Sequence, residues 1–322
     1  VFIPMCALNE VKGMKLKMIE IKDNLDDARF VTHAGSFHAD DIFATIFLEK
    51  VFQNIELYRT NEITSDMKIE EKIVYDIGLG KFDHHQKEVK TRENGIKYSS
   101  FGLLFECFGK EYLQKLCQDH VEEVYQMYLN ELVYQIDAID NGQFPKLNST
   151  YKITTLSDII GLFNKTWCEE KEANQCFLEC ISIAKSIYNR IEQKILDKIK
   201  AISLVETAIS KTKDEILILE TYMPFMDFII SSTDPKASQI LFVITPSNRG
   251  GYSIQTVHKT LDTYENRLDF PSEWGGLSKE KLASKTGIKT FRFCHKNLFC
   301  AASDTLEDAI AIAKLAIQKR RS

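Results

Sequence analysis

Two short clusters of histidine and aspartate constrain this chain more than any other feature of its sequence. The first reads His33-Ala-Gly-Ser-Phe-His38-Ala-Asp40-Asp41, and the second reads Asp83-His84-His85. Four of the chain's seven histidines fall in these clusters. Both clusters follow strand-like stretches, and ligands of parallel α/β sheets bind at the carboxyl ends of strands. We therefore expect a fold that gathers imidazoles and carboxylates at one edge of a sheet.

The residues around the clusters alternate between strand-like and helix-like patterns. Strands are expected over residues 29–32, 55–59 and 72–77. A helical pattern begins at Ser36, which we expect to cap the helix. Strand, helix and strand in succession favour an α/β sheet with parallel strands.

Helices and then a second set of strands fill the rest of the chain. Helices are expected over residues 99–108, ending at Gly109, over 111–139, and over 169–204 as a connector. We expect an α/β fold: a parallel-sheet N-terminal domain and a smaller α+β C-terminal domain, joined by a long helical connector. The expected boundaries are 1–28 for an N-terminal extension, 29–205 for the first domain with its connector, and 206–322 for the second domain.

Composition narrows the class of protein. The net charge is −5, which argues against a protein that coats nucleic acid through charge alone, although the region from residue 240 onward has more Lys and Arg than Asp and Glu. No apolar run is long enough to span a bilayer, so we expect no membrane partner. Eight cysteines occur without a C-x-x-C pair, which favours reduced thiols in a cytoplasmic protein.

The ligand types favour a catalytic metal site over a structural one. Cysteine is absent from both clusters, whereas imidazole mixed with carboxylate suits Mn²⁺, Mg²⁺, Fe²⁺ or catalytic Zn²⁺. The candidates outnumber the ligands of one ion, and two ions bridged by a carboxylate would use them all. Asp76 is the expected bridge, because it lies alone at a strand end between the clusters. Taken singly, any of these histidines could be a core residue, and Asp40 and Asp41 could simply complement a helix dipole.

Several ordered segments resemble a known family. The chain is similar to the melanocyte-proliferating-gene protein family, metal-dependent hydrolases and exonucleases of the DHH phosphoesterase superfamily. The segments that carry the resemblance are Thr32–Asp41, Tyr75–Gly78, Phe82–Gln86, Tyr98–Leu103, Ile136–Gly142, Gln255–Val257 and Phe270–Leu277. Two segments depart from the family pattern: Tyr252 replaces a tryptophan, and His295–Phe299 lacks the usual glycine.

The resemblance implies a role for each site residue. His33 and His38 would bind one divalent ion, and Asp40, His84 and Asp140 the other, with Asp76 as the bridge. Asp76, Asp83 and His85 would be the catalytic residues, and His85 would face the substrate phosphate. The two ions, Mn²⁺ above all with Mg²⁺ as an option, would activate a water molecule for attack on phosphorus.

The second domain is expected to supply anion-binding groups. The substrate-binding candidates are Arg249, Gln255, His258 and His295, with Lys259 beside them. The resemblance favours a 3′–5′ exonuclease or phosphodiesterase on RNA, DNA or short oligonucleotides, hence a nucleic acid or nucleotide partner. Two alternatives stay open: a phosphatase on a mononucleotide or pyrophosphate, and a non-enzymatic, metal-stabilised binding protein. Self-association as a homo-oligomer is a further possibility.

Overall fold

The computed structural model describes residues 18–117, 120–146 and 148–321. The chain divides into two compact units, one that ends at Ile195 and one that begins at Leu196. The expected boundaries at residues 28 and 205 stay predictions, and residues 1–17 of the expected extension lie outside the described residues. Residues 18–21 of that extension form a strand of the first sheet.

The first unit is built on a four-stranded parallel sheet, as the strand and helix patterns predicted. Its strand order is β1-β3-β2-β4. Every pairing is parallel, so the carboxyl ends of the strands share one edge. The strands are β1 (Met18–Ile21), β2 (Phe30–His33), β3 (Asn54–Thr60) and β4 (Ile73–Val74).

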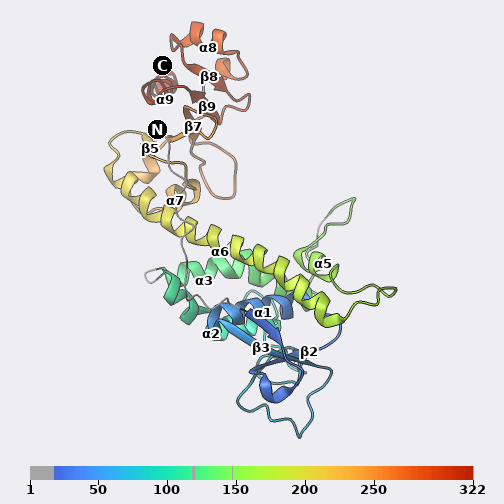
Figure 1. Ribbon diagram of the computed structural model, residues 1–322. Helices are drawn as coiled ribbons and strands as arrows, with labels where there is room; N and C mark the ends of the chain where they lie inside the picture. The colour runs from blue at the N-terminus through green and yellow to red at the C-terminus, as the bar shows by residue number, and fades with distance from the viewer. Residues whose placement is uncertain (1–17, 118–119, 147, 322) are drawn as a thin grey trace, which may run out of the picture. The chain divides into compact units, whose positions relative to one another are not determined.

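Helices pack on the sheet of the first unit, and the first of them is almost entirely buried. Helix α1 (Ala39–Phe52) is buried from Ala39 to Glu49, because it lies between the sheet and further helices (Figure 1). The remaining elements of the unit are η1 (Leu25–Asp27), α2 (Ser100–Cys117), α3 (Val121–Tyr128), the π-helical segment η2 (Leu129–Val133), α4 (Tyr134–Asp140) and α5 (Leu156–Gly161). Helix α6 (Ala173–Lys211) begins in this unit and ends in the second.

Two helix predictions in this unit were wrong. Gly109 was expected to end a helix, but α2 continues through it to Cys117. The glycine is there for packing: a Cβ atom at Gly109 would lie 3.2 Å from the ring of Tyr125. The helix expected over residues 111–139 is therefore divided: residues 111–117 belong to α2, and residues 121–139 lie in α3, η2 and α4.

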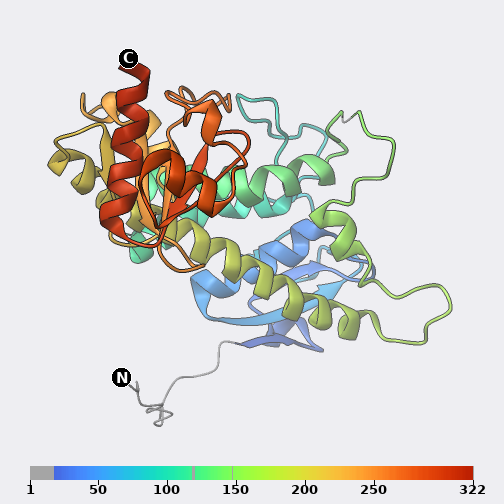
Figure 2. The same cartoon turned by 90° about the horizontal axis from the view of Figure 1, so that it is seen from above.

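The second unit is a five-stranded mixed sheet with α9 on one face. Its strand order is β5-β6-β7-β9-β8, where β5 and β6 are parallel and the other pairs antiparallel. Figure 2 shows α9 lying along the strands. The elements are β5 (Ile216–Ile218), α7 (Met226–Ser231), η3 (Ala237–Gln239), β6 (Phe242–Pro246), β7 (Tyr252–Thr256), η4 (Ser272–Trp274), α8 (Lys279–Thr286), β8 (Phe291–Cys294), β9 (Cys300–Ser303) and α9 (Leu306–Arg321).

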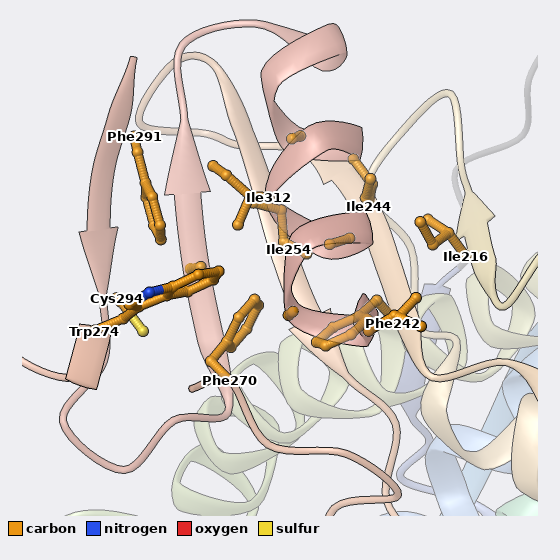
Figure 3. Packing of buried hydrophobic residues seen from close by; sticks show 14 of the residues in the cluster. Ile216, Phe242, Ile244, Ile254, Phe270, Trp274, Phe291, Cys294 and Ile312 are labelled. Atoms are coloured by element: carbon orange, nitrogen blue, oxygen red, sulfur yellow. The ribbon is translucent and has the colours of Figure 1, made fainter. Parts of the chain in front are cut away.

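The core of this unit is aromatic and aliphatic. Trp274 is fully buried, and its ring meets Phe291 edge-on with 5.4 Å between centroids (Figure 3). Ile254 of β7 and Ile312 of α9 close the same core. The seven cysteines that the structure describes are free thiols. None of the helices in the described part of the chain is long and apolar enough to cross a membrane.

Candidate metal centre

The first cluster extends from the end of β2 through the following loop into the first turn of α1. His33 is the last residue of β2, and the loop behind it is held by Arg59, whose guanidinium donates to the carbonyl oxygen of His33 over 3.1 Å. Arg59 is 7% exposed and its guanidinium lies 4.1 Å from the ring centre of Phe177, so the anchor is rigid. The backbone of His33 is thereby held at the carboxyl edge of the sheet.

The helix after this loop begins later than predicted. Its N-cap is His38, so the expectation that Ser36 caps the helix was wrong. The side chain of Asp41 explains the difference, because its Oδ1 accepts a hydrogen bond from the backbone N–H of His38 at 3.1 Å. Asp40 and Asp41 consequently lie in the first helical turn, both fully buried.

Asp76 occupies a turn of unusual backbone geometry. Strand β4 ends at Val74 instead of Ile77, and Asp76 has φ +57°, a left-handed conformation uncommon for residues other than glycine. The backbone N–H of Asp76 donates to the carbonyl oxygen of Phe82 at 3.1 Å, which folds this turn back on itself. Such strained residues persist where the surroundings hold them, often at functional sites.

The two carboxylate oxygens of Asp76 face different clusters. Oδ2 lies 3.2 Å from Nε2 of His33, whereas Oδ1 lies 3.4 Å from Nε2 of His84 and 3.6 Å from Nδ1 of His85. Ser100, the first residue of α2, donates its hydroxyl to Oδ1 at 3.0 Å. One carboxylate thus connects both halves of the site, which is the geometry a bridging ligand needs.

Asp40 is a buried carboxylate with unsatisfied oxygens. Within the described residues, neither of its oxygens has a hydrogen-bond partner, and Nε2 of His84 is 3.8 Å away. Nε2 of His84 is closer to Asp140, at 3.0 Å. Buried charges are normally paired or coordinate a metal. The residues therefore fit a divalent cation, which would satisfy the Asp40 carboxylate.

The electrostatics of the site show the same need for positive charge. Burial lowers the pKa of His33, but the carboxylates of Asp41 and Asp76 outweigh it and raise that pKa to about 10. Burial also lowers the pKa of His84, but the carboxylates of Asp140 and Asp76 outweigh it and raise that pKa to about 10. Burial and neighbouring carboxylates hold the pKa of Asp40 well above its usual range. Protons on the two histidines thus balance charge that metal ions could balance instead.

The three residues of the Asp83-His84-His85 segment make different contacts. Oδ2 of Asp83 accepts from the backbone N–H of Leu79 at 2.6 Å, and Oδ1 accepts from that of His85 at 3.0 Å. Oδ1 also lies 2.8 Å from Nδ1 of the His85 ring. Asp83 therefore orients His85, whose side chain is 58% exposed, while His84 points into the buried part of the site.

In the part of the chain that the structure describes, three groups of side chains lie close enough together to hold an ion. They are His33, Asp41 and Asp76; Asp76, His84 and His85; and His38, Asp40 and Asp140. His38 therefore lies with Asp40 and Asp140, although its ring centre is also 6.2 Å from that of His33. Asp41 was not among the candidate ligands predicted from the sequence. Its Oδ2 lies 2.8 Å from Nε2 of His33, which places it in the site. The motif contained it, but helix capping was the simpler interpretation.

The substrate-binding candidates of the second unit lie at two ends of its sheet. Gln255 on β7 pairs with Cys300, whose carbonyl oxygen accepts from the backbone N–H of His295 at 2.8 Å. His258 follows β7 at this same end. Arg249 lies in the β6–β7 turn at the opposite end. Lys259 pairs with Glu265 at 2.9 Å.

Fold and site together define an α/β protein whose parallel sheet presents histidine and aspartate clusters suited to divalent metals. The family model for MYG1 exonuclease, described as an uncharacterised protein family (UPF0160), matches residues 29–317. The chain therefore belongs to the MYG1 family, which confirms the resemblance seen in its motifs.

Named relatives match over nearly the whole chain. A MYG1 protein of Dictyostelium discoideum is 27% identical and aligns with 90% of this chain and 96% of its own length. A human protein named MYG1 exonuclease is 25% identical, with 91% and 86% covered. A pGpG-specific phosphodiesterase from Vibrio cholerae is matched at 13% identity over 91% of this chain and 98% of that chain, but its TM-score of 0.24 supports no argument.

Proposed function

We propose that this chain is a divalent-metal-dependent phosphoesterase of the DHH superfamily, and that it acts as a 3′–5′ exonuclease on RNA, DNA or short oligonucleotides. The observation that carries the proposal is Asp76, whose two oxygens face separate His/Asp groups. The exonuclease names of its relatives support the choice of substrate. We further propose Mn²⁺ as the metal, a cytoplasmic location and, as an open possibility, self-association.

Each site residue has a proposed task. His33, His38, Asp40, Asp76, His84 and Asp140 would hold two ions, with Asp41 beside His33. Divalent ions bound there supply Lewis acidity, which lowers the pKa of water and offsets charge on phosphoryl oxygens. Arg249, Gln255, His258 and His295 are proposed to bind the substrate. Their separation along the sheet means that Arg249 would contact a different part of the substrate from the other three.

His85 is the proposed group that handles a proton or a phosphoryl oxygen. Its Nδ1 is engaged by Asp83, which fixes the ring and leaves Nε2 directed elsewhere. A carboxylate behind an imidazole sets its tautomer and its orientation. The exposed ring can therefore donate from Nε2 to a phosphate oxygen or accept a proton there.

The test is hydrolysis by the purified chain with added Mn²⁺. We expect 5′-labelled RNA or DNA to shorten stepwise from its 3′ end, and Asp76→Asn to abolish the reaction while circular dichroism shows an intact fold. An amide offers one neutral acceptor where the bridge needs two anionic oxygens. Cleavage of pyrophosphate or mononucleotides alone would identify a phosphatase instead. No hydrolysis of any of these substrates by folded, metal-loaded protein would overturn the proposal.

A further inference from the structure

Exposed apolar side chains concentrate in one segment of the first unit. Among the residues that the structure describes between positions 144 and 167, six large hydrophobic side chains are exposed: Phe144, Tyr151, Ile153, Ile159, Leu162 and Trp167. Trp167 is the extreme case, with 98% of its surface exposed. Single exposed hydrophobic residues need no explanation, but concentrated ones mark binding sites.

This segment is hydrogen-bonded to the loop that leads into the candidate metal centre. Asn164 forms two hydrogen bonds with the backbone of Phe37: its Oδ1 accepts from the N–H at 2.9 Å, and its Nδ2 donates to the carbonyl oxygen at 2.8 Å. Phe37 immediately precedes His38, a candidate ligand. Trp167 comes three positions after Asn164, a chain length of at most about 11 Å. The backbone that carries the indole therefore lies within that distance of the residue that binds Phe37.

The turn that carries the indole is itself ordered. The backbone N–H of Thr166 donates to Oε2 of Glu169 at 2.7 Å, and the N–H of Glu169 donates to the carbonyl oxygen of Thr166 at 3.2 Å. Trp167 is thus presented to solvent by a closed turn. Beside it, Lys165 is exposed and forms no ion pair with the described part of the chain. An aromatic ring next to an unpaired cation is the pairing that single-stranded nucleic acids bind.

We propose that Trp167 is a stacking subsite for a nucleobase of the strand whose phosphodiester enters the metal centre, with Lys165 contacting the adjoining phosphate. This inference rests on the proposed function. Glu170 and Glu172 follow the turn and weaken its attraction for phosphate. Stacking therefore supplies most of the binding, and every base offers a face for it, so the subsite recognises single strands without regard to sequence.

Kinetics with two matched strands test the subsite. Removing one base–aromatic stack should raise KM about 5- to 150-fold. We expect Trp167→Ala to do this for a pentanucleotide, with kcat within about twofold, and to leave KM unchanged for an abasic strand of equal charge. Trp167→Phe should retain most of the binding. Tyr222→Ala, at an exposed aromatic residue of the second unit, is the control and should change neither strand. Equal effects on both strands, or less than a twofold effect, would overturn the subsite.

Fluorescence gives a readout that needs no catalysis. The chain has two tryptophans, and Trp274 is fully buried, so acrylamide quenching of emission reports on Trp167. Adding the pentanucleotide without metal should protect Trp167, while the abasic strand should not. Protection without hydrolysis under Mn²⁺ would support the subsite and refute the proposed chemistry. Hydrolysis without protection would do the reverse. Quenching that is already weak in the free protein, and weakens further with protein concentration, would mean that another protein surface covers the indole, which overturns the proposal.

Discussion

Replacing Gly102 with alanine should destabilise the first unit by about 2–5 kcal/mol, although the change adds a better helix former. Gly102 lies in the first turn of α2, and a Cβ atom there would lie 2.0 Å from Oδ2 of Asp137. Helix propensity alone favours alanine by up to about 1 kcal/mol. The clash makes the substitution destabilising, because real Cβ atoms do not come closer than about 3 Å to other atoms.

The cost follows from what Asp137 would lose by moving away. Its Oδ1 accepts from the hydroxyl of Ser99 at 2.5 Å and from the N–H of Gly102 at 3.1 Å, and its Oδ2 lies 2.6 Å from Nη2 of Arg92. Arg92 is held by the Tyr98 ring, 3.6 Å from its guanidinium. Hydrogen bonds to charged groups contribute roughly 1.5–3 kcal/mol each. Losing two of them outweighs the propensity gain and leaves the net loss stated above.

The assay is urea denaturation followed by circular dichroism, with hydrogen exchange to locate the loss in α2 and α4. Emission from Trp274 reports the second unit and should not change. Gly161→Ala is the matched control, since nothing lies within 4 Å of its Cβ position, and it should be neutral or slightly stabilising. If Gly102→Ala proves as stable as the parent chain, Asp137 is not held as the structure shows and the reasoning fails.

Three further outcomes are expected. Protein reloaded with Mn²⁺ and desalted should retain up to two ions per chain by elemental analysis, and less than half an equivalent would contradict a two-ion centre. Arg249→Ala and His295→Ala should each lower kcat/KM by about 10- to 1000-fold with metal content unchanged; less than a threefold change in both would remove them from the substrate site. Burial raises the pKa of Asp137 to about 6, against Arg92 and Ser99. Between about pH 4 and 6 the carboxyl group of Asp137 is therefore protonated in the native state and ionised in the unfolded state. Its contribution to the free energy of unfolding should fall by roughly 3 kcal/mol as the pH rises through that range. Urea titrations at several pH values should show this dependence in the parent chain and lose it in Asp137→Asn.

Local patterns predicted the parallel sheet and placed His33 and Asp76 at its carboxyl edge. They could do so because the periodicity of strands and helices, and the ends of strands, depend on residues that are close together in the sequence. Contacts between distant residues were not predictable in this way. The bonds from Asn164 to Phe37 span 127 positions, and nothing near either residue indicates them. Gly109 looked like a helix terminator because its partner, Tyr125, belongs to another helix. Arg249 and His295 were grouped as anion-binding candidates in family-like segments, whereas strand register places them at opposite ends of the sheet.

The π-helical turn at Leu129–Val133 has an evolutionary consequence. Val124, Tyr128, Leu132 and Ile136 are all buried at a strict four-residue interval, which in an α-helix drifts by about 40° per step. The wider turn takes up part of that drift and so keeps the later residues facing inward. Deleting one residue here would restore a plain α-helix and leave Asp140 facing His84, whereas a deletion elsewhere in α3 or α4 would rotate that carboxylate by about 100°. Among descendants of this sequence, the loss of a single residue from this helical stretch should therefore be tolerated at the π turn and not in the turns beside it, because only there does the Asp140 carboxylate keep its orientation.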